Sequence, residues 1–333
     1  TKAVKLTLGE WKEVEIEDEE DGNEGGDGED EGPTMEYRVV PIDDPVEMPA
    51  AQIVEDNPVH KYEIIESPVK KIRVGYLMYN SFTAGTKAEP EKYNNELRSV
   101  SQKFKEAGVQ AVILDLRYNE GGSMDCVQLL GTILTSANRL GEPMAYLEYN
   151  DKNTDKDATI LFGTDMEINL NLHSLIAITS GTTMGAPEML IRSLFLEDTY
   201  PIATVGSSTK GQNVATEQFI NEEFLWSVNP VVCTVYNSQH DTYGAISPAT
   251  DLKVSETTID GSTNYSEFLP FGTFDKDGKS ERLLKIAIGV LDGTYPPKDD
   301  ETPEESTTQT RFKVEKSVSS PASRRFSSKG LRL

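Results

Sequence analysis

A repeated alternation of short apolar strands and amphipathic helices constrains the fold of this chain more than any other feature. Residues 109–116, VQAVILDL, form a continuous apolar run, which is typical of a strand buried on both faces of a sheet. Repeated βα units of this kind predict an α/β fold with a mainly parallel sheet and right-handed crossovers. Strands are predicted at residues 72–80, 109–116, 175–179 and 202–206, and helices at 90–108, 124–134, 189–195 and 280–293.

The regions that flank the βα units differ from them in composition and in the pattern of apolar residues. Residues 1–16 alternate apolar and polar side chains and predict a hairpin, or the last strand of a unit that begins earlier. Residues 17–70 combine an acidic loop with a Pro-rich, extended connecting arm. Residues 71–295 carry the βα units, and within them residues 224–254 predict a smaller antiparallel region that closes one side. Residues 296–333 are rich in Ser, Thr and Pro and predict a disordered tail with too few apolar residues to pack.

The charge is strongly negative and unevenly distributed. The chain has 56 acidic and 32 basic residues, for a net charge of −24, which argues against a nucleic-acid partner because repulsion opposes association with phosphates. Residues 15–31 hold eleven of the acidic residues and no basic residue. We interpret that run as a solvated loop, because it lacks the residue order of an EF-hand calcium loop.

Neither a metal site nor a cofactor is predicted. Cys126 and Cys233 lie far apart without a CxxC pairing, and the three histidines are scattered without metal-ligand spacing. No window has the roughly 18 consecutive apolar residues that a membrane-spanning helix needs, and Thr1 does not begin a recognisable signal peptide.

The stretch ITSGTTMGAPEMLIRSLF, residues 178–195, is the candidate active site. An apolar strand runs through a Thr/Gly turn into an amphipathic helix, and backbone N–H groups at such a helix start can stabilise an oxyanion. The apex of this turn, Met184-Gly185-Ala186, nevertheless lacks a Ser or Cys nucleophile.

Five motifs in order resemble the carboxyl-terminal processing (tail-specific) serine peptidases, which are related to the tricorn protease core. They are VGYLMYNSF, LDLRYNEGGS, ITSGTTMGAPE, VGSSTKGQNV and YGAISPATDLKV, within residues 70–292. The resemblance implies a crotonase/Clp-protease-like fold. It also implies that the strand VKLTL, within residues 1–16, is the end of a PDZ-type domain.

The resemblance assigns roles to three residues. The family junction reads TASASE, with a Ser nucleophile and a supporting Glu three residues later, and a Lys general base follows about 25 residues after the Ser. By position, Gly185 stands where the nucleophile would be, Glu188 is the supporting residue, and Lys210 is the general base. A lysine base needs its pKa lowered from about 10.4 to about 7–8, usually by burial. We therefore expect Lys210 to be half-buried against the helix start.

The oxyanion hole also carries over by position. Gly121 and Gly122 match the glycine turn that supplies one N–H, and Ala186 follows the nucleophile position and would supply the other. Pro187 departs from the family Ser; it removes an amide but is tolerated in a first helical turn.

Gly185 changes the expected chemistry. Without a side-chain oxygen no acyl-enzyme forms at this position, and loss of a nucleophile costs on the order of a million-fold in turnover in a well-studied protease. Two alternative mechanisms are considered. In the first, the hydroxyl of Ser180, Thr182 or Thr183 replaces the lost one; in the second, Lys210 activates a water in the vacated space.

The sequence thus supports two readings of function. The first is a Ser/Lys-type peptidase for unstructured or C-terminal peptide segments, inactive or nearly so in this form, through natural loss or an introduced substitution. The alternative is a non-catalytic peptide-binding pseudopeptidase, and an acyl-thioester enzyme of the crotonase type is a remote third. In either of the first two cases the partner is a peptide or an unfolded protein. The resemblance implies a periplasmic or outer-membrane location in a bacterium.

Overall fold

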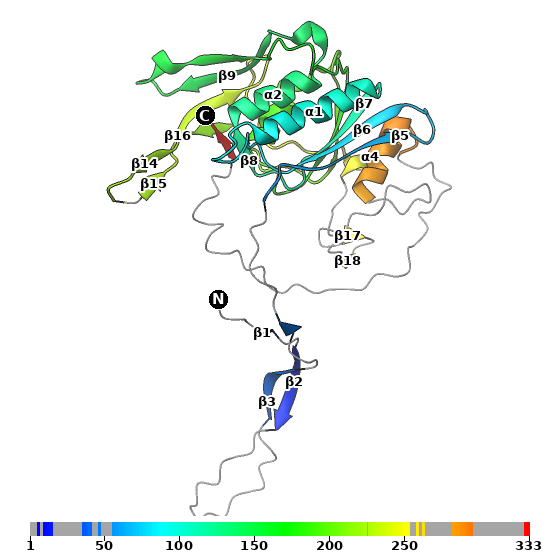
Figure 1. Ribbon diagram of the computed structural model, residues 1–333, viewed down its shortest axis with the longest axis vertical. Helices are drawn as coiled ribbons and strands as arrows, with labels where there is room; N and C mark the ends of the chain where they lie inside the picture. Colours follow the sequence, from blue (N-terminus) through cyan, green and yellow to red (C-terminus); the bar gives the residue numbers. More distant parts are fainter. Residues whose placement is uncertain are drawn as a thin grey trace, which may run out of the picture. The chain divides into compact units, whose positions relative to one another are not determined.

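The βα units form a five-stranded sheet with the strand order β12-β11-β7-β6-β5. Figure 1 labels its strands β5, β6 and β7. β6 (Arg73–Tyr79), β7 (Ala111–Asp115), β11 (Leu175–Thr179) and β12 (Ile202–Gly206) are parallel, and β5 (Val59–Glu66) joins the edge in the antiparallel sense. Every residue of β7 is buried, as its apolar run predicts. The predicted parallel sheet is confirmed. The arm predicted within residues 17–70 contributes β5 to this sheet.

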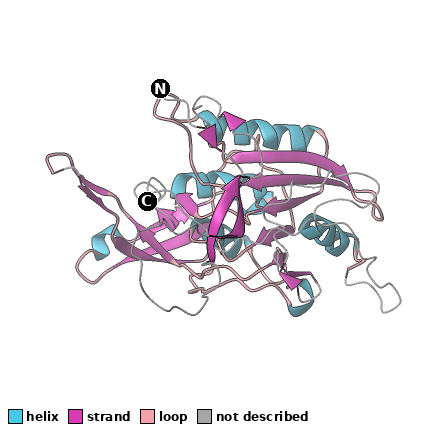
Figure 2. Ribbon diagram, turned by 90° about the horizontal axis from the view of Figure 1, so that it is seen from below, coloured by secondary structure: helices cyan, strands magenta, loops and turns pink. Residues whose placement is uncertain are grey.

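Among the described residues, helices lie on both sides of the sheet. α1 (Lys92–Glu106), α2 (Met124–Leu134) and α3 (Ala186–Leu194) pack with one hydrophobic cluster, and α4 (Arg282–Asp292) packs with another. α4 contacts β11 and β12, whereas α2 contacts α1 and α3. Figure 2 shows helices on both sides of the strands.

The two clusters follow from the alternation of side chains along each strand. In β6, Leu77 belongs to the cluster with α1 to α3, while its neighbour Tyr76 belongs to the cluster with α4. β7 divides in the same way between Leu114 and Ile113. The carboxyl ends of these strands, where ligand sites of open α/β sheets lie, are therefore held from both faces.

A second, six-stranded sheet has the order β10-β9-β16-β13-β19-β8. β10, β9, β16 and β13 pair in the antiparallel sense, which agrees with the expected closing region. The prediction was wrong for residues 243–253, because the structure has no strand there, only loop and the short 3-10 helix η3. The bounds are β8 (Gly121–Ser123), β9 (Pro143–Tyr149), β10 (Ala158–Leu161), β13 (Val214–Thr216), β16 (Val231–Tyr236), β19 (Gly330–Arg332) and η3 (Thr250–Leu252).

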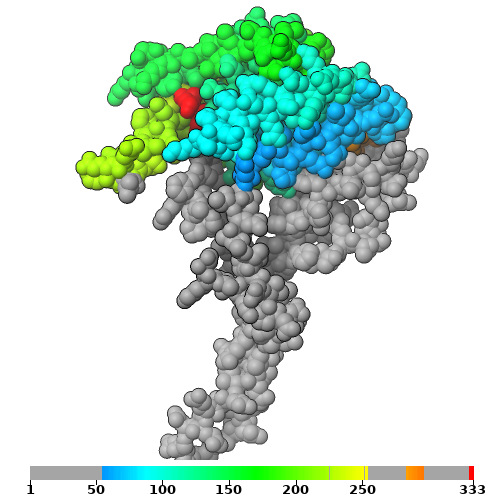
Figure 3. Space-filling model, viewed as in Figure 1, coloured from blue at the N-terminus to red at the C-terminus, as the bar shows by residue number. Residues whose placement is uncertain are grey.

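At residues 330–332, β19 corrects the predicted disordered tail, whereas residues 296–329 lie outside the described residues. It lies between β13 and β8, runs parallel to both, and buries Leu331 to 1% exposure. One buried apolar side chain and pairing with two neighbouring strands hold this segment in the sheet. The average composition of residues 296–333 does not reveal such a short pattern. In Figure 3 the red atoms of this end lie at the surface, beside the yellow-green and cyan parts of the chain.

The structure, a computed structural model, describes residues 55–224, 226–253, 282–295 and 330–333, together with short strands elsewhere. The chain divides into two units, Thr1–Asp56 and Asn57–Leu333. In the first, β2 pairs with β3 and β1 with β4, so the partners of the strands within residues 1–16 lie at residues 35–47, outside the range predicted for the hairpin. The acidic run at 17–31 lies outside the described residues. The remaining elements are β1 (Lys5–Leu6), β2 (Gly9–Glu15), β3 (Met35–Pro41), β4 (Val46–Glu47), β14 (Phe219–Asn221), β15 (Trp226–Val228), β17 (Thr258–Ile259), β18 (Ser262–Thr263), η1 (Ala137–Arg139) and η2 (Thr154–Lys156).

Candidate active site

Gly185 lies at a sharp turn between β11 and α3. Its backbone has φ 72° and ψ −104°, a region that residues with a side chain rarely adopt. α3 begins at the next residue, Ala186, and Pro187 fits in its first turn as expected. A strained strand-to-helix turn of this kind is what holds the nucleophile of many α/β hydrolases above the sheet. The chain thus has the backbone of a nucleophile elbow with a glycine at its apex.

Glu188 holds the elbow and the Lys210 turn together. Its side chain is fully buried, and its carboxylate accepts hydrogen bonds from backbone amides on both sides. The Gly185 amide donates to Oε2 at 2.8 Å and the Gln212 amide at 2.9 Å, while the Gly211 amide and the Thr209 hydroxyl donate to Oε1. Four donors satisfy a buried carboxylate without a cationic partner.

Tyr243, in the following loop, lies near enough to the same buried charge to interact with it electrostatically. Burial raises the pKa of the Tyr243 phenol above its ordinary value, and the charge of Glu188 raises it further. The motif YGAISPATDLKV therefore packs its first residue against the site as loop rather than as strand.

Lys210 is near the elbow by its backbone, while its side chain is exposed. The Lys210 amide donates to the Thr183 carbonyl at 3.1 Å, which fixes the turn beside the helix start. The side chain itself is exposed, whereas the sequence predicts half-burial. The flanking residues Thr209 and Gly211 point their polar groups at Glu188, so that the lysine between them faces outward.

The glycine turn at 121–122 lies beside the elbow. The Met184 amide donates to the Asn119 carbonyl at 3.2 Å, and the Asn119 side-chain amide donates to the Tyr79 carbonyl at 2.8 Å. The Gly121 amide donates to Oδ1 of Asn119 at 2.9 Å. Because the Gly121 amide already donates to Asn119, an oxyanion site here would depend on the amides of Gly122 and Ala186.

The hydroxyl groups near the apex hold the turn in place. The Thr183 hydroxyl donates to the Leu116 carbonyl at 2.9 Å and accepts from the Ser180 amide at 3.0 Å. The Ser180 and Thr182 hydroxyls both contact the Arg117 carbonyl. With their protons donated to main-chain carbonyls, these groups are poorly placed to act as nucleophiles in place of a residue at 185.

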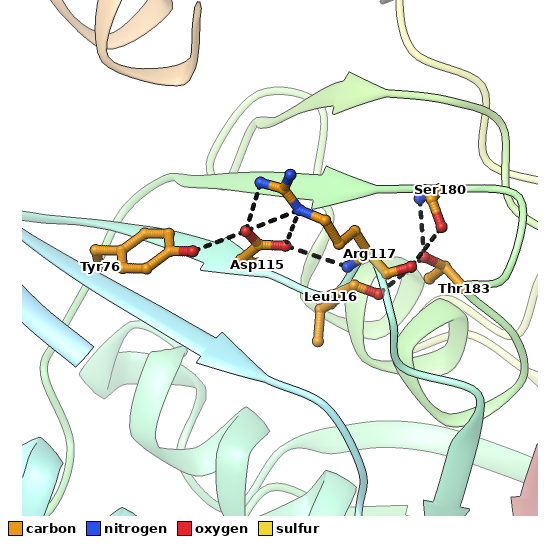
Figure 4. Close-up of polar contacts among 6 residues, drawn as sticks. All are labelled: Tyr76, Asp115, Leu116, Arg117, Ser180 and Thr183. Atoms are coloured by element: carbon orange, nitrogen blue, oxygen red, sulfur yellow. Dashed lines mark hydrogen bonds and ion pairs between the residues drawn. The ribbon is translucent and has the colours of Figure 1, made fainter. Parts of the chain in front are cut away.

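A buried ion pair at the end of β7 supports this turn, and the sequence analysis missed it (Figure 4). Asp115 and Arg117 are 0% and 3% exposed, and the Arg117 Nη2 atom lies 2.7 Å from Asp115 Oδ2. The Tyr76 hydroxyl donates to the same oxygen at 2.8 Å. The order Asp-Leu-Arg at the end of a buried strand was the available signal. The pair fixes the 116–117 carbonyls that receive the hydroxyls of the elbow.

The third neighbour of the elbow is β19. Gly330 pairs with Gly121 and Leu331 with Gly122, so this strand runs along the glycine turn. A Cβ atom placed on Gly185 would lie 2.5 Å from the Leu331 amide nitrogen and 2.6 Å from the Gly330 Cα. The chain's own backbone therefore fills the space in which a nucleophile side chain would start.

Within the part of the chain that the structure describes, no cluster of His, Cys, Asp and Glu is suited to hold a metal ion. No described helix has the length and hydrophobicity needed to span a bilayer.

Comparisons with known proteins agree with this architecture. The model of peptidase family S41 matches residues 73–229. A crystal structure described as an S41 protease from Bacteroides fragilis aligns with 32% identity and a TM-score of 0.64, over 87% of this chain and 66% of that chain. The chain thus spans about two thirds of that structure's length.

Other solved structures are more distant. The photosystem II D1 C-terminal processing protease has 16% identity and a TM-score of 0.45, over 66% of this chain and 52% of that one. A structure described as a peptidase from Parabacteroides merdae has 19% identity and a TM-score of 0.43, over 71% and 65% of the two chains. A search of curated protein sequences found no match. The family match and the Bacteroides fragilis structure together show that the chain belongs to peptidase family S41, the hydrolase family that its motifs resemble.

Proposed function

We propose that this chain binds extended peptides with the scaffold of an S41 peptidase and does not hydrolyse them through an acyl-enzyme. The observation that carries the proposal is Gly185 at the apex of an intact elbow. The backbone strain, the Glu188 network and the glycine turn are all present, but residue 185 has no side-chain oxygen to attack a substrate.

The surrounding residues support a loss of turnover rather than its transfer to another group. The hydroxyls of Ser180 and Thr183 are donated to main-chain carbonyls, and the Lys210 side chain is exposed. A general base must come within hydrogen-bonding reach of the proton that it removes. With no hydroxyl at 185 and no lysine buried beside it, neither step of the Ser/Lys mechanism has its reacting groups.

Peptide binding is supported by the strand geometry of the site. β8 and β13 present main-chain groups to the extended strand β19 that lies between them, and pairing of an extended segment with a strand is a recurrent mode of peptide recognition. The periplasmic or outer-membrane location stays a prediction from the family resemblance.

The proposal is tested by incubating the protein with casein and with fluorogenic unstructured peptides. We expect no hydrolysis above the buffer rate in the wild-type protein or in a Lys210→Ala variant. Hydrolysis by the wild-type protein that disappears in Lys210→Ala would contradict the proposal, because it would mean that this lysine activates water or another hydroxyl. Failure of extended peptides to bind once the site has been opened, as described below, would contradict the binding half.

A further inference from the structure

The slot between β8 and β13 already contains a peptide strand, which comes from the chain itself. The Gly330 amide donates to the Glu120 carbonyl at 2.6 Å, and the Leu333 amide donates to the Thr216 carbonyl at 3.1 Å. The Thr216 hydroxyl donates to the Leu331 carbonyl at 3.2 Å. The segment is therefore bound along both sides by main-chain and hydroxyl groups.

The slot fits a segment with a glycine followed by a bulky apolar residue. Gly330 has φ 98° and faces Gly121 so closely that a Cβ on Gly121 would overlap the Gly330 carbonyl. A Cβ on Gly330 would itself overlap the side chain of Gln212. The next residue, Leu331, is buried in the main hydrophobic cluster. Small and apolar positions thus alternate in the way that a sequence-selective strand site requires.

Gly185 is the residue that makes room for this strand. A Cβ at that position would lie 2.5 to 2.7 Å from three backbone atoms of residues 330 and 331, closer than real Cβ atoms approach other atoms. Backbone atoms in a paired strand cannot rotate away as the end of a flexible side chain can. A nucleophile at 185 and a strand in this position are therefore mutually exclusive.

We propose that the slot is a peptide-binding site whose resident ligand is residues 330–333 of this chain, and that Gly185 is what admits this ligand. The inference rests on the proposed function and names its ligand: an extended strand of the form Gly-Leu-basic-Leu. The resident strand occupies the glycine turn and the space at the elbow, so a peptide supplied in solution binds only when the strand has left.

Charge complementarity favours the same ligand. The segment carries Arg332, and basic residues precede it at Arg324, Arg325 and Lys329, while the chain as a whole has a net charge of −24. A basic strand is attracted to an acidic protein over a range that salt shortens.

Hydrogen exchange of the full chain, read by mass spectrometry, tests the resident strand. We expect the amides of residues 331–333 to be protected in the wild-type protein and to lose about 100-fold in protection in Gly185→Ala. Gly181→Ala is the matched control, because a Cβ at Gly181 has no atom within 4 Å, and it should leave the protection unchanged. Equal protection of the strand in wild type and Gly185→Ala, or no protection in wild type, would overturn the proposal.

Because a side chain at φ 72° also strains the elbow, a second variant leaves Gly185 intact. Leu331→Asp places a charge in the apolar cluster and should release the strand while the elbow stays in place. The probe is the peptide SSKGLRL, acetylated, amidated and fluorescently labelled, whose anisotropy reports binding. We expect it to bind Leu331→Asp at least about tenfold more tightly than wild type, since the resident strand competes. The same peptide carrying Gly330→Val should not bind.

The results separate this inference from the proposed function. Binding of unrelated extended peptides, equally well to wild type and Leu331→Asp, would overturn the resident strand and leave peptide binding standing. If residues 331–333 are protected in wild type but no peptide binds Leu331→Asp, the strand is a fixed part of the sheet. The proposal that the slot is a peptide-binding site would then be wrong.

Discussion

The Glu188 carboxylate is the most sharply testable interaction of the site, and we predict that Glu188→Gln destabilises the protein strongly. Four donors converge on the carboxylate, two on each oxygen, and the side chain has no exposed surface. In the glutamine variant one oxygen becomes an NH2 group, which cannot accept a hydrogen bond. Two buried donors then lose their acceptor, at about 1–3 kcal/mol each, so the free energy of unfolding falls by about 2–6 kcal/mol.

Urea unfolding followed by circular dichroism measures this change. The matched control is Glu197→Gln, three residues beyond the end of α3 on an exposed side chain, which should alter the free energy of unfolding by less than about 0.5 kcal/mol. A second variant, Thr209→Ala, removes one donor and should cost less than Glu188→Gln. If Glu188→Gln were no more destabilising than Glu197→Gln, the Glu188 carboxylate would not be the group that holds the elbow and the Lys210 turn together.

Three further predictions follow from buried groups. Arg117→Met leaves Asp115 buried without its cation and should lower the free energy of unfolding by about 3–5 kcal/mol, measured by urea unfolding; a change below about 1 kcal/mol would refute the buried pair. Burial raises the pKa of the Cys126 thiol to about 12 and that of Cys233 to about 11, so both should react with a thiol reagent at pH 8 only after unfolding, and rapid labelling of the native protein would contradict this. Burial opposes ionisation of Asp292, but backbone amides of residues 69 and 70 outweigh it and lower the pKa of this carboxyl. Its contribution is therefore present above about pH 4 and lost as the pH falls through the lowered pKa, so Asp292→Asn should be more destabilising at pH 7 than at pH 2, as thermal unfolding at several pH values can check. Equal destabilisation at both pH values would argue against this role of the charge.

The sequence predicts the parallel sheet and its helices well, because each element carries its own periodicity. β11 and α2 agree with their predicted bounds, and the elbow is visible as a strand that ends in a Thr/Gly turn. These signals are local. A strand that is buried on both faces is apolar along its length, so it can be recognised without knowing which strands lie beside it.

The features that the sequence did not reveal depend on distant partners. β19 is a three-residue strand whose stability comes from β8 and β13, so its own composition predicts only a loop. Lys210 lies in a turn whose orientation Glu188 determines from 22 residues away, and spacing alone does not say which side of a turn a side chain faces. The residue types of Asp115 and Arg117 allow an ion pair to be predicted from the sequence. Its burial, with the Tyr76 hydroxyl donating to Asp115, depends on the neighbouring strand and is seen only in the structure.

The elbow with Gly185 at its apex has no nucleophile. This can be measured by intact mass after incubation with a fluorophosphonate, which labels activated serine and threonine hydroxyls. We expect an unchanged mass for the wild-type protein, since the hydroxyls of residues 180, 182 and 183 contact main-chain carbonyls. A single phosphonyl adduct on any of these three residues would contradict it.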